Sequence, residues 1–236
     1  MLNEFFNIIQ AGHKDSSPKF THLFLGSLIY LVISITSFEF AAIQPLPLLV
    51  LIPLAIMATE LFRKNEKPLV ASSVTLLGIA YISIPLAILS LLFLLPQDSS
   101  SGFPWIVLGL FAIIWINDTF SYITGILLGR NKLFERISPK KTWEGAIGGL
   151  VFSVAGGFAL YTFSGEYSLG IWLIMAALIA ISSVFGDLTE SMIKRSLKIK
   201  DSGNILPGHG GLLDRFDSLL FASPVVYVFL TLLNQT

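Results

Sequence analysis

The sequence contains no cysteine among its 236 residues. This absence excludes disulfide bonds, thiolate metal sites and a cysteine nucleophile. Charged residues are also scarce, at 13% of the chain, against about 25% in a typical soluble domain. The formal net charge is zero, so no overall basic field favours a nucleic acid, and we expect none among the partners. The N-terminal segment lacks a basic stretch followed by an apolar one, so we expect no cleavable signal peptide.

Hydrophobic residues make up 54% of the chain and gather in seven long runs. Each run is near the ~20 residues that a helix needs to cross a ~30 Å hydrocarbon core. The runs are Phe20–Phe38, Gln44–Phe62, Leu69–Leu95, Pro104–Gly129, Gly145–Ser164, Leu169–Leu188 and Asp217–Asn234. We therefore expect an all-α polytopic membrane protein with about seven transmembrane helices, forming a single integral membrane domain over residues 1–236.

The 15 lysine and arginine residues fall in alternate gaps between these runs. Cytoplasmic loops of membrane proteins collect lysine and arginine, so the alternation predicts orientation as well as class. We expect the N-terminus inside, the C-terminus outside and the two longest polar loops on the cytoplasmic side.

A few acidic residues lie within or at the ends of the apolar runs. An ionised carboxylate near mid-membrane costs roughly 2.5–3.5 kcal/mol even on insertion scales, so it must face protein, water or a cation. We assign Asp118 and Asp187 to function on this ground. For Glu60 we favour a structural interpretation, a charge at a helix end near Arg63 and Lys64.

Three local features bear on packing. The fifth run is rich in glycine, and small residues let helix backbones approach closely in a membrane, so we assign Gly156 and Gly157 to packing rather than function. Pro85 lies inside the long third run, which is expected to tilt or kink there. Near the N-terminus, the apolar residues between Phe5 and Ile9 favour one face of an interfacial helix, with a frayed terminus as the alternative.

The first long polar loop, Gly129–Gly145, combines five cations with a serine and a threonine. This composition suits a polyanion such as a nucleotide triphosphate, and the alternative is an ordinary positive-inside loop. Ser138 and Pro139, followed by Glu144, predict a helix start whose backbone N–H groups are free for phosphate.

The second long polar loop, Ser191–Asp217, mixes basic residues with carboxylates and glycines. Asp214 and Asp217 are three residues apart, so a helix would point them the same way. Together with Asp187 they would form a hard-oxygen cluster suited to Mg²⁺, beside cations suited to phosphates. That pairing is what phosphoryl or nucleotidyl transfer requires. His209 is expected to contact a ligand or to act as a structural donor.

The residues of this loop resemble the signature of the phosphatidate cytidylyltransferases, also called CDP-diacylglycerol synthases. The matching positions are Ser191, Lys194, Arg195, Lys200, Asp201, Gly203, Leu206, Pro207, His209, Gly210, Gly211, Asp214, Arg215 and Asp217. Two upstream blocks, Asn117–Tyr122 and Ile137–Gly145, also look like the family. The resemblance runs from about Glu60 to the C-terminus.

The resemblance implies that CTP and phosphatidate give CDP-diacylglycerol and pyrophosphate, with Mg²⁺ required and a monovalent cation such as K⁺ as a second metal. A phosphate oxygen of the lipid would attack the α-phosphorus of CTP. Metal ligands would be Asp187, Asp214 and Asp217, and the catalytic cations Lys194, Arg195, Lys200 and Arg215. Residues binding substrate would be Asn117, Asp118, Ser138, Lys140, Lys141, Thr142, Asp201, His209, Gly210 and Gly211.

The resemblance also implies partners and a location. We expect CTP, phosphatidate and membrane lipids as partners, a homodimer as one option for assembly, and a bacterial inner membrane with the active site facing the cytoplasm. The family usually begins with two further spans, which we expect this chain to lack. The alternatives are a CTP-dependent lipid kinase, an isoprenoid-lipid cytidylyltransferase or, in a different class, an ion-coupled transporter with Asp118 on its ion path.

Overall fold

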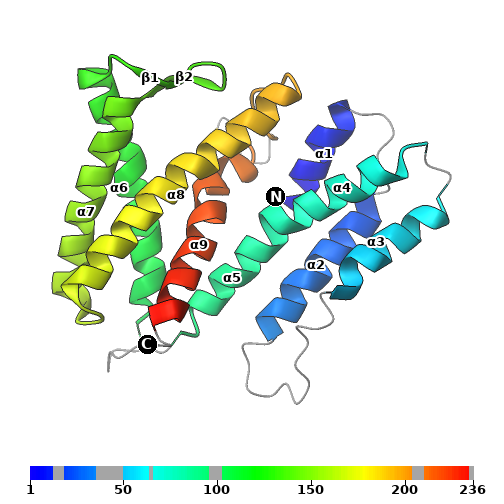
Figure 1. Cartoon of the computed structure of the whole chain (residues 1–236), viewed down its shortest axis with the longest axis horizontal. Coiled ribbons are helices and arrows are strands. Elements are labelled where there is room, and N and C mark those ends of the chain that lie inside the picture. Colours follow the sequence, from blue (N-terminus) through cyan, green and yellow to red (C-terminus); the bar gives the residue numbers. More distant parts are fainter. Residues whose placement is uncertain (13–18, 36–49, 64–65, 96–102, 204–209, 234–236) are drawn as a thin grey trace. The chain divides into compact units, whose positions relative to one another are not determined.

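The computed structural model describes residues 1–12, 19–35, 50–63, 66–95, 103–203 and 210–233 (Figure 1). This described part is mostly α-helical and includes a two-stranded antiparallel ribbon. The chain divides into two compact units. The first consists of Met1–Leu91 with Asp201–Arg215, and the second of Leu92–Lys200 with Phe216–Thr236.

The first unit is helical over its N-terminal part. Its elements are α1 (Leu2–Gly12), α2 (Lys19–Ile35), α3 (Leu51–Leu61), α4 (Pro68–Gly78), the π-helical segment η2 (Ile79–Ser83) and α5 (Ile84–Leu92). The expected N-terminal helix is present as α1, and it packs against α2, α4 and η2. Its apolar face is buried within the unit, with Phe5 0% and Phe6 2% exposed. The Phe5 ring lies 6.2 Å from the Tyr81 ring, so this face forms part of a core rather than an exposed membrane-surface stripe.

The third apolar run forms α4, η2 and α5 in succession, and its irregularity lies just before Pro85. In η2 the Ile84 N–H donates to the Ile79 carbonyl, five residues back instead of four. Proline lacks an N–H, and its ring clashes with the carbonyl four residues earlier in a regular α-helix. A wider turn ahead of Pro85 relieves that clash, and π-turns typically occur as such short insertions in α-helices.

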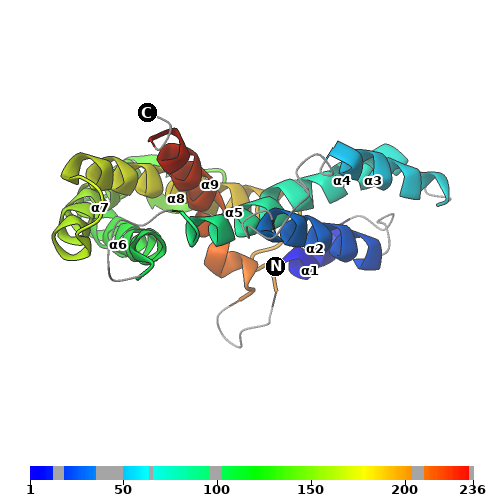
Figure 2. The same cartoon turned by 90° about the horizontal axis from the view of Figure 1, so that it is seen from below.

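The second unit contains four long helices and the ribbon. They are α6 (Trp105–Leu128), β1 (Lys132–Phe134), β2 (Ser138–Thr142), α7 (Trp143–Ser164), α8 (Leu169–Ser196) and most of α9 (Leu213–Leu233). Helix α7 packs along α6, and α8 packs against both. Figures 1 and 2 show these three helices side by side, and Figure 1 shows the ribbon at one end of α6 and α7.

Five helices in the described part are long and apolar enough to cross a membrane: Pro68–Leu92, Trp105–Leu128, Trp143–Ser164, Leu169–Ser196 and Leu213–Leu233. They coincide with five of the seven expected spans. The other two expected spans correspond to the shorter apolar helices Leu23–Ile35 and Leu51–Leu61. Residues 36–49, which separate these two helices in the sequence, lie outside the described residues. The chain is therefore a polytopic membrane protein with at least five helices of spanning length.

The glycines of α7 lie against neighbouring helices, as expected. A Cβ on Gly156 would lie 2.7 Å from Cδ1 of Ile116 in α6. A Cβ on Gly157 would lie 2.8 Å from Cβ of Ala176 and 2.9 Å from the Trp172 carbonyl oxygen in α8. Helix backbones approach this closely only where a side chain is missing, so the packing interpretation is confirmed.

Glu60 has the structural role predicted for it. Its carboxylate is 6% exposed and pairs with Arg63 at 2.8 Å, one turn further along the chain. The Arg63 guanidinium also donates to Thr21 Oγ1 of α2 at 2.6 Å. The pair therefore neutralises a buried charge and ties the end of α3 to α2, while Lys64 lies outside the described residues.

We expect Gly157→Ala to destabilise the second unit by about 1–3 kcal/mol, because the added methyl group overpacks the interface of α7 with α8. The matched control is Gly170→Ala in α8, where an added Cβ meets only Ser168 Oγ at 4.0 Å. Thermal unfolding in detergent should show a lower midpoint for Gly157→Ala and an unchanged or higher one for Gly170→Ala. Equal midpoints for the two variants would contradict close packing at Gly157.

Candidate active site

The first polar loop folds as the β1–β2 ribbon, with Lys132 paired to Thr142 and Phe134 to Ser138. The helix start expected at Ser138 and Pro139 is wrong, because both residues belong to strand β2 and α7 begins at Trp143. Thr142 is the residue that caps α7, since its Oγ1 accepts the Gly145 N–H at 3.1 Å. A threonine in extended conformation directly before a helix satisfies a free first-turn N–H group, which explains why the helix begins there.

The base of the ribbon is fastened by Glu144, in the first turn of α7. Its carboxylate accepts the Arg130 N–H at 3.1 Å, the Asn131 N–H at 3.2 Å and Asn131 Nδ2 at 2.7 Å. The Trp143 N–H also donates to the Asn131 carbonyl at 3.0 Å. These bonds hold the two ends of the ribbon together. The backbone that carries the ribbon's lysine and arginine residues is therefore fixed at its base.

Charged groups from four elements of the second unit meet at one place. Lys141 of β2 forms an ion pair with Asp187 of α8. Asp217, in the first turns of α9, interacts electrostatically with Asp187, Asp118 and Lys141. The Asn117 side chain, which precedes Asp118 in α6, hydrogen-bonds to the Asp118 carboxylate. The structure thus assembles five predicted site residues that are up to 100 positions apart in sequence.

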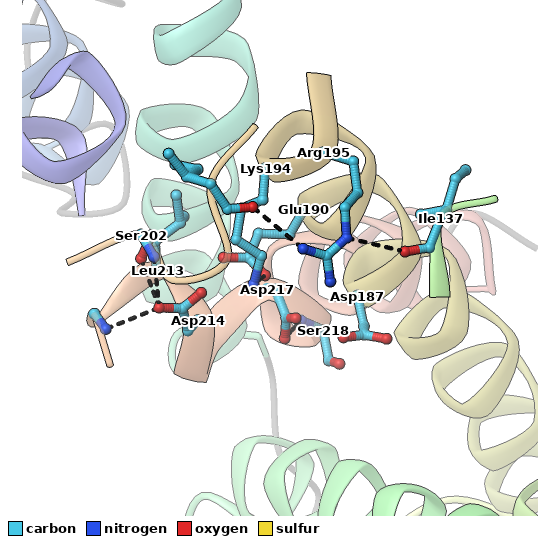
Figure 3. Close-up of polar contacts among 12 residues, drawn as sticks. Ile137, Asp187, Glu190, Lys194, Arg195, Ser202, Leu213, Asp214, Asp217 and Ser218 are labelled. Atoms are coloured by element: carbon cyan, nitrogen blue, oxygen red, sulfur yellow. Dashed lines mark hydrogen bonds and ion pairs between the residues drawn. The ribbon is translucent and has the colours of Figure 1, made fainter. Parts of the chain in front are cut away.

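A glycine brings the carboxylates of α8 and α9 together. A Cβ on Gly186 would lie 2.5 Å from the Asp217 carbonyl oxygen and 2.9 Å from Ser218 Cα, so only glycine fits against α9 here. Ser218 Oγ donates to the Ser183 carbonyl at 3.3 Å, and the Ser218 N–H donates to Asp217 Oδ1 at 2.5 Å. Figure 3 shows Asp187, Asp217 and Ser218 together at this crossing. The close approach holds the Asp217 carboxylate near that of Asp187.

The two cations at the end of α8 already have partners within the second unit. Lys194 Nζ lies 2.6 Å from Oε2 of Glu190, a carboxylate that is 1% exposed. Arg195 Nε donates to the Ile137 carbonyl at 3.5 Å, and Arg195 Nη1 donates to the Ile199 carbonyl at 3.2 Å (Figure 3). Arg195 therefore connects the ribbon to the end of α8. The spacing of four residues between Glu190 and Lys194 is the sequence signal that could have identified their pair.

Asp214 belongs to the first unit, where its carboxylate organises the second polar loop. Oδ2 accepts the Ser202 N–H at 2.9 Å, Ser202 Oγ at 2.9 Å and the Gly211 N–H at 2.8 Å (Figure 3). Gly210 has a positive φ of 80°, and a Cβ there would lie 2.9 Å from Oδ2. Gly210 therefore leaves room for the Asp214 carboxylate.

The remaining predicted site residues differ in their exposure. Lys140, Lys200, Asp201 and Arg215 are exposed, Ser138 is partly buried and Asn117 is 2% exposed. Thr142 is 6% exposed, and its hydroxyl oxygen accepts the Gly145 N–H. This hydrogen bond gives the hydroxyl a structural role that needs no ligand. His209 lies outside the described residues.

The carboxylates suit Mg²⁺ in their chemistry, although in the described residues no group of three or more acidic or histidine side chains is arranged to hold a metal ion. Of the three expected ligands, Asp187 and Asp217 lie in the second unit and Asp214 in the first. Mg²⁺ is usually bound by one or two carboxylates together with water and substrate phosphates. Asp187 and Asp217 supply two carboxylates within one unit, and they interact electrostatically with each other.

Comparison with known proteins gives a consistent match. Residues 1–233 match the model of the cytidylyltransferase family. A phosphatidate cytidylyltransferase of Staphylococcus saprophyticus is 37% identical over 177 residues, which is 74% of this chain and 65% of that protein. Its namesake in Staphylococcus epidermidis is 34% identical over 206 residues, or 86% of this chain and 76% of that protein. The phosphatidate cytidylyltransferase of Staphylococcus aureus is 35% identical over 177 residues, with the same shares as the first. The matched segment thus spans slightly less than two thirds of two of these relatives.

We expect Thr142→Ala to lower the free energy of unfolding by about 1 kcal/mol, because it removes the cap of α7. Thr142→Ser keeps the hydroxyl and is the matched control. Unfolding midpoints in detergent should rank wild type close to the serine variant and above the alanine variant. If the serine variant were as unstable as the alanine variant, the methyl group of Thr142, and not its hydrogen bond, would be the stabilising part.

Proposed function

The chain belongs to the cytidylyltransferase family, and from this we propose that it makes CDP-diacylglycerol and pyrophosphate from CTP and phosphatidate. The observation that supports this most directly is the meeting of Asp118, Lys141, Asp187 and Asp217 in one unit of a membrane protein. Carboxylates that suit a divalent cation, next to lysines that suit phosphate, are the parts that transfer between two phosphorylated substrates needs. The names of the relatives favour phosphatidate as the acceptor.

The proposed reaction needs positioning and charge neutralisation more than acid–base chemistry. An anionic phosphate oxygen of phosphatidate forms a bond to the α-phosphorus of CTP, and the bond from that phosphorus to the oxygen bridging to the β-phosphate breaks. Pyrophosphate leaves with the electron pair. Because the attacking oxygen already carries negative charge, no general base is required, and the barrier is lowered by holding the two anions in line.

Within this proposal, Asp187 and Asp217 would hold Mg²⁺. The ion would neutralise the polyphosphate and stabilise the charge that develops on the leaving group. One oxygen of Asp214 accepts the Ser202 and Gly211 N–H groups. The predicted role of Asp214 as a metal ligand remains a proposal. A second, monovalent cation such as K⁺ is proposed from the family resemblance alone.

Lysine and arginine side chains bind the phosphates in this proposal. Lys141 and Lys194 are paired with Asp187 and Glu190 respectively. These pairs keep the ammonium groups in place, and an arriving phosphate would share or replace the carboxylate partner. Lys140, Lys200 and Arg215 are exposed, and they would bind the more distant phosphates or the lipid headgroup.

We also propose seven spans with the N-terminus inside and the C-terminus outside, in a bacterial inner membrane. The distribution of lysine and arginine supports this orientation, which places the ribbon and the second polar loop on the cytoplasmic side with CTP. Phosphatidate would enter from the surrounding lipid. For the assembly, a homodimer remains a proposal.

With purified protein, label at the α-phosphate of CTP should enter the lipid fraction, and label at the γ-phosphate should be released as pyrophosphate. The transfer should require phosphatidate and Mg²⁺, because the proposed reaction moves the cytidylyl group. Appearance of the γ-label in lipid would instead indicate a CTP-dependent lipid kinase. Transfer of the α-label to polyprenyl phosphate and not to phosphatidate would indicate an isoprenoid-lipid cytidylyltransferase, and absence of any transfer would reject nucleotide chemistry.

One variant tests the proposed metal site in this assay, and a second serves as its control. Asp217→Asn removes one negative charge from the proposed metal site, so turnover should fall by orders of magnitude, each ~1.4 kcal/mol of lost stabilisation being tenfold in rate. Glu66→Gln changes an exposed carboxylate between α3 and α4 and should retain wild-type turnover. Full activity of Asp217→Asn would remove this residue from the site.

The orientation predicts that a reporter fused after Thr236 reads as non-cytoplasmic, while one inserted between Arg136 and Ser138 in the ribbon reads as cytoplasmic. Paired alkaline phosphatase and fluorescent protein fusions measure both positions. A cytoplasmic reading at the C-terminus would contradict the proposed number of spans or their direction.

A further inference from the structure

The buried carboxylate of Glu4 is bonded to a segment more than 200 positions away in the sequence, within the first unit. Glu4 is 3% exposed. Its Oε1 accepts the Leu212 N–H at 2.8 Å, and its Oε2 accepts the Leu213 N–H at 2.9 Å. One side chain near the start of the chain thus satisfies two successive backbone donors at the start of α9.

These two N–H groups are of a kind that requires an external partner. Leu213 is the first residue of α9, and the first N–H groups of a helix have no acceptor within it. A serine, threonine or aspartate before the helix usually fills this role, but the preceding residue here is Leu212, which has no polar side chain. Glu4 supplies the missing cap from α1, and its negative charge is favourable beside the positive end of the helix dipole.

Two glycines of the second polar loop leave space for this carboxylate. A Cβ on Gly203 would lie 3.1 Å from Glu4 Oε1, and one on Gly211 would lie 3.0 Å from the same atom. The Gly211 N–H is in turn bonded to Asp214 at 2.8 Å. The backbone from Gly211 to Leu213 is therefore held by two carboxylates, one from α1 and one from α9 itself.

We propose that Glu4 is a positioning residue for the cytidylyl transfer. By capping α9 it fixes the turn of helix that carries Asp214, with Asp217 one turn further along the same helix. Glu4 acts on the helix backbone and needs no contact with substrate. This inference rests on the proposed function and adds to it a residue outside the polar loops that carry the family signature.

The variants Glu4→Ala and Glu4→Gln test the proposal, with Glu60→Gln as the matched control. Glu60 is likewise buried in the first unit, but it pairs with Arg63, just beyond α3, and Arg63 in turn bonds Thr21 of α2. The measurements are hydrogen–deuterium exchange of peptides spanning Gly210 to Asp217, the kcat and KM for CTP of the full-length protein, and the unfolding midpoint.

We expect Glu4→Ala to speed exchange at the Leu212 and Leu213 amides and to lower kcat roughly 100-fold, the loss expected when a catalytic group is misplaced by about 1 Å. The KM for CTP should change little. Glu4→Gln keeps one acceptor oxygen and should be intermediate, which keeps the test decisive if the alanine variant fails to fold. Glu60→Gln should lower the unfolding midpoint without changing kcat of the folded protein.

Three results would overturn the proposal. Faster exchange with full kcat would make Glu4 a structural cap only. Reduced kcat with unchanged exchange at residues 212 and 213 would show that Glu4 acts by another route. A wild-type protein that makes no CDP-diacylglycerol would reject the proposed function and the positioning role with it, and the exchange measurement would then report on the cap alone.

Discussion

The scarcity of water inside a membrane is the constraint on which the rest of this structure depends. A charge without a partner costs several kcal/mol there, so each buried ionic group must be matched within the protein. The buried Glu60 is matched by Arg63 and the buried Glu190 by Lys194, while the partly exposed Asp187 pairs with Lys141. Removing one partner of a buried pair is strongly destabilising, because it leaves the other charge buried and uncompensated. The pairs therefore hold charged side chains in fixed positions.

Several carboxylates of this chain accept hydrogen bonds from backbone N–H groups. Glu144 binds the N–H groups at the base of the ribbon, Asp214 those of Ser202 and Gly211, and Glu4 those at the start of α9. Charge-assisted hydrogen bonds of this kind are about twice as strong as neutral ones. These bonds hold the base of the ribbon and, in the second polar loop, the backbone at Ser202 and from Gly211 to Leu213.

Features that depend on hydrophobic length and on small residues were predicted well from the sequence. Five of the seven runs became helices of spanning length, and Gly156 and Gly157 became packing contacts, because both features depend on local composition. Prediction failed where a particular partner decides the outcome. The start of α7 depends on which residue caps it, so Thr142 and not Pro139 sets the boundary. The role of Glu4 was not predicted, because its partners, Leu212 and Leu213, lie at the other end of the chain.

The π-helical segment η2 has a consequence for how chain length can vary in this protein. A π-turn contains one residue more than the α-turn it replaces, and each residue of an α-helix rotates the following side chains by about 100°. Deleting a single residue between Ile79 and Ser83 would convert the turn to an α-turn and leave the faces of α4 and α5 in their present relation. The same deletion in the regular helix α6 would rotate everything beyond it. The segment before Pro85 is therefore a site where a homologous helix that lacks this proline can be one residue shorter and still present the same faces to its neighbours.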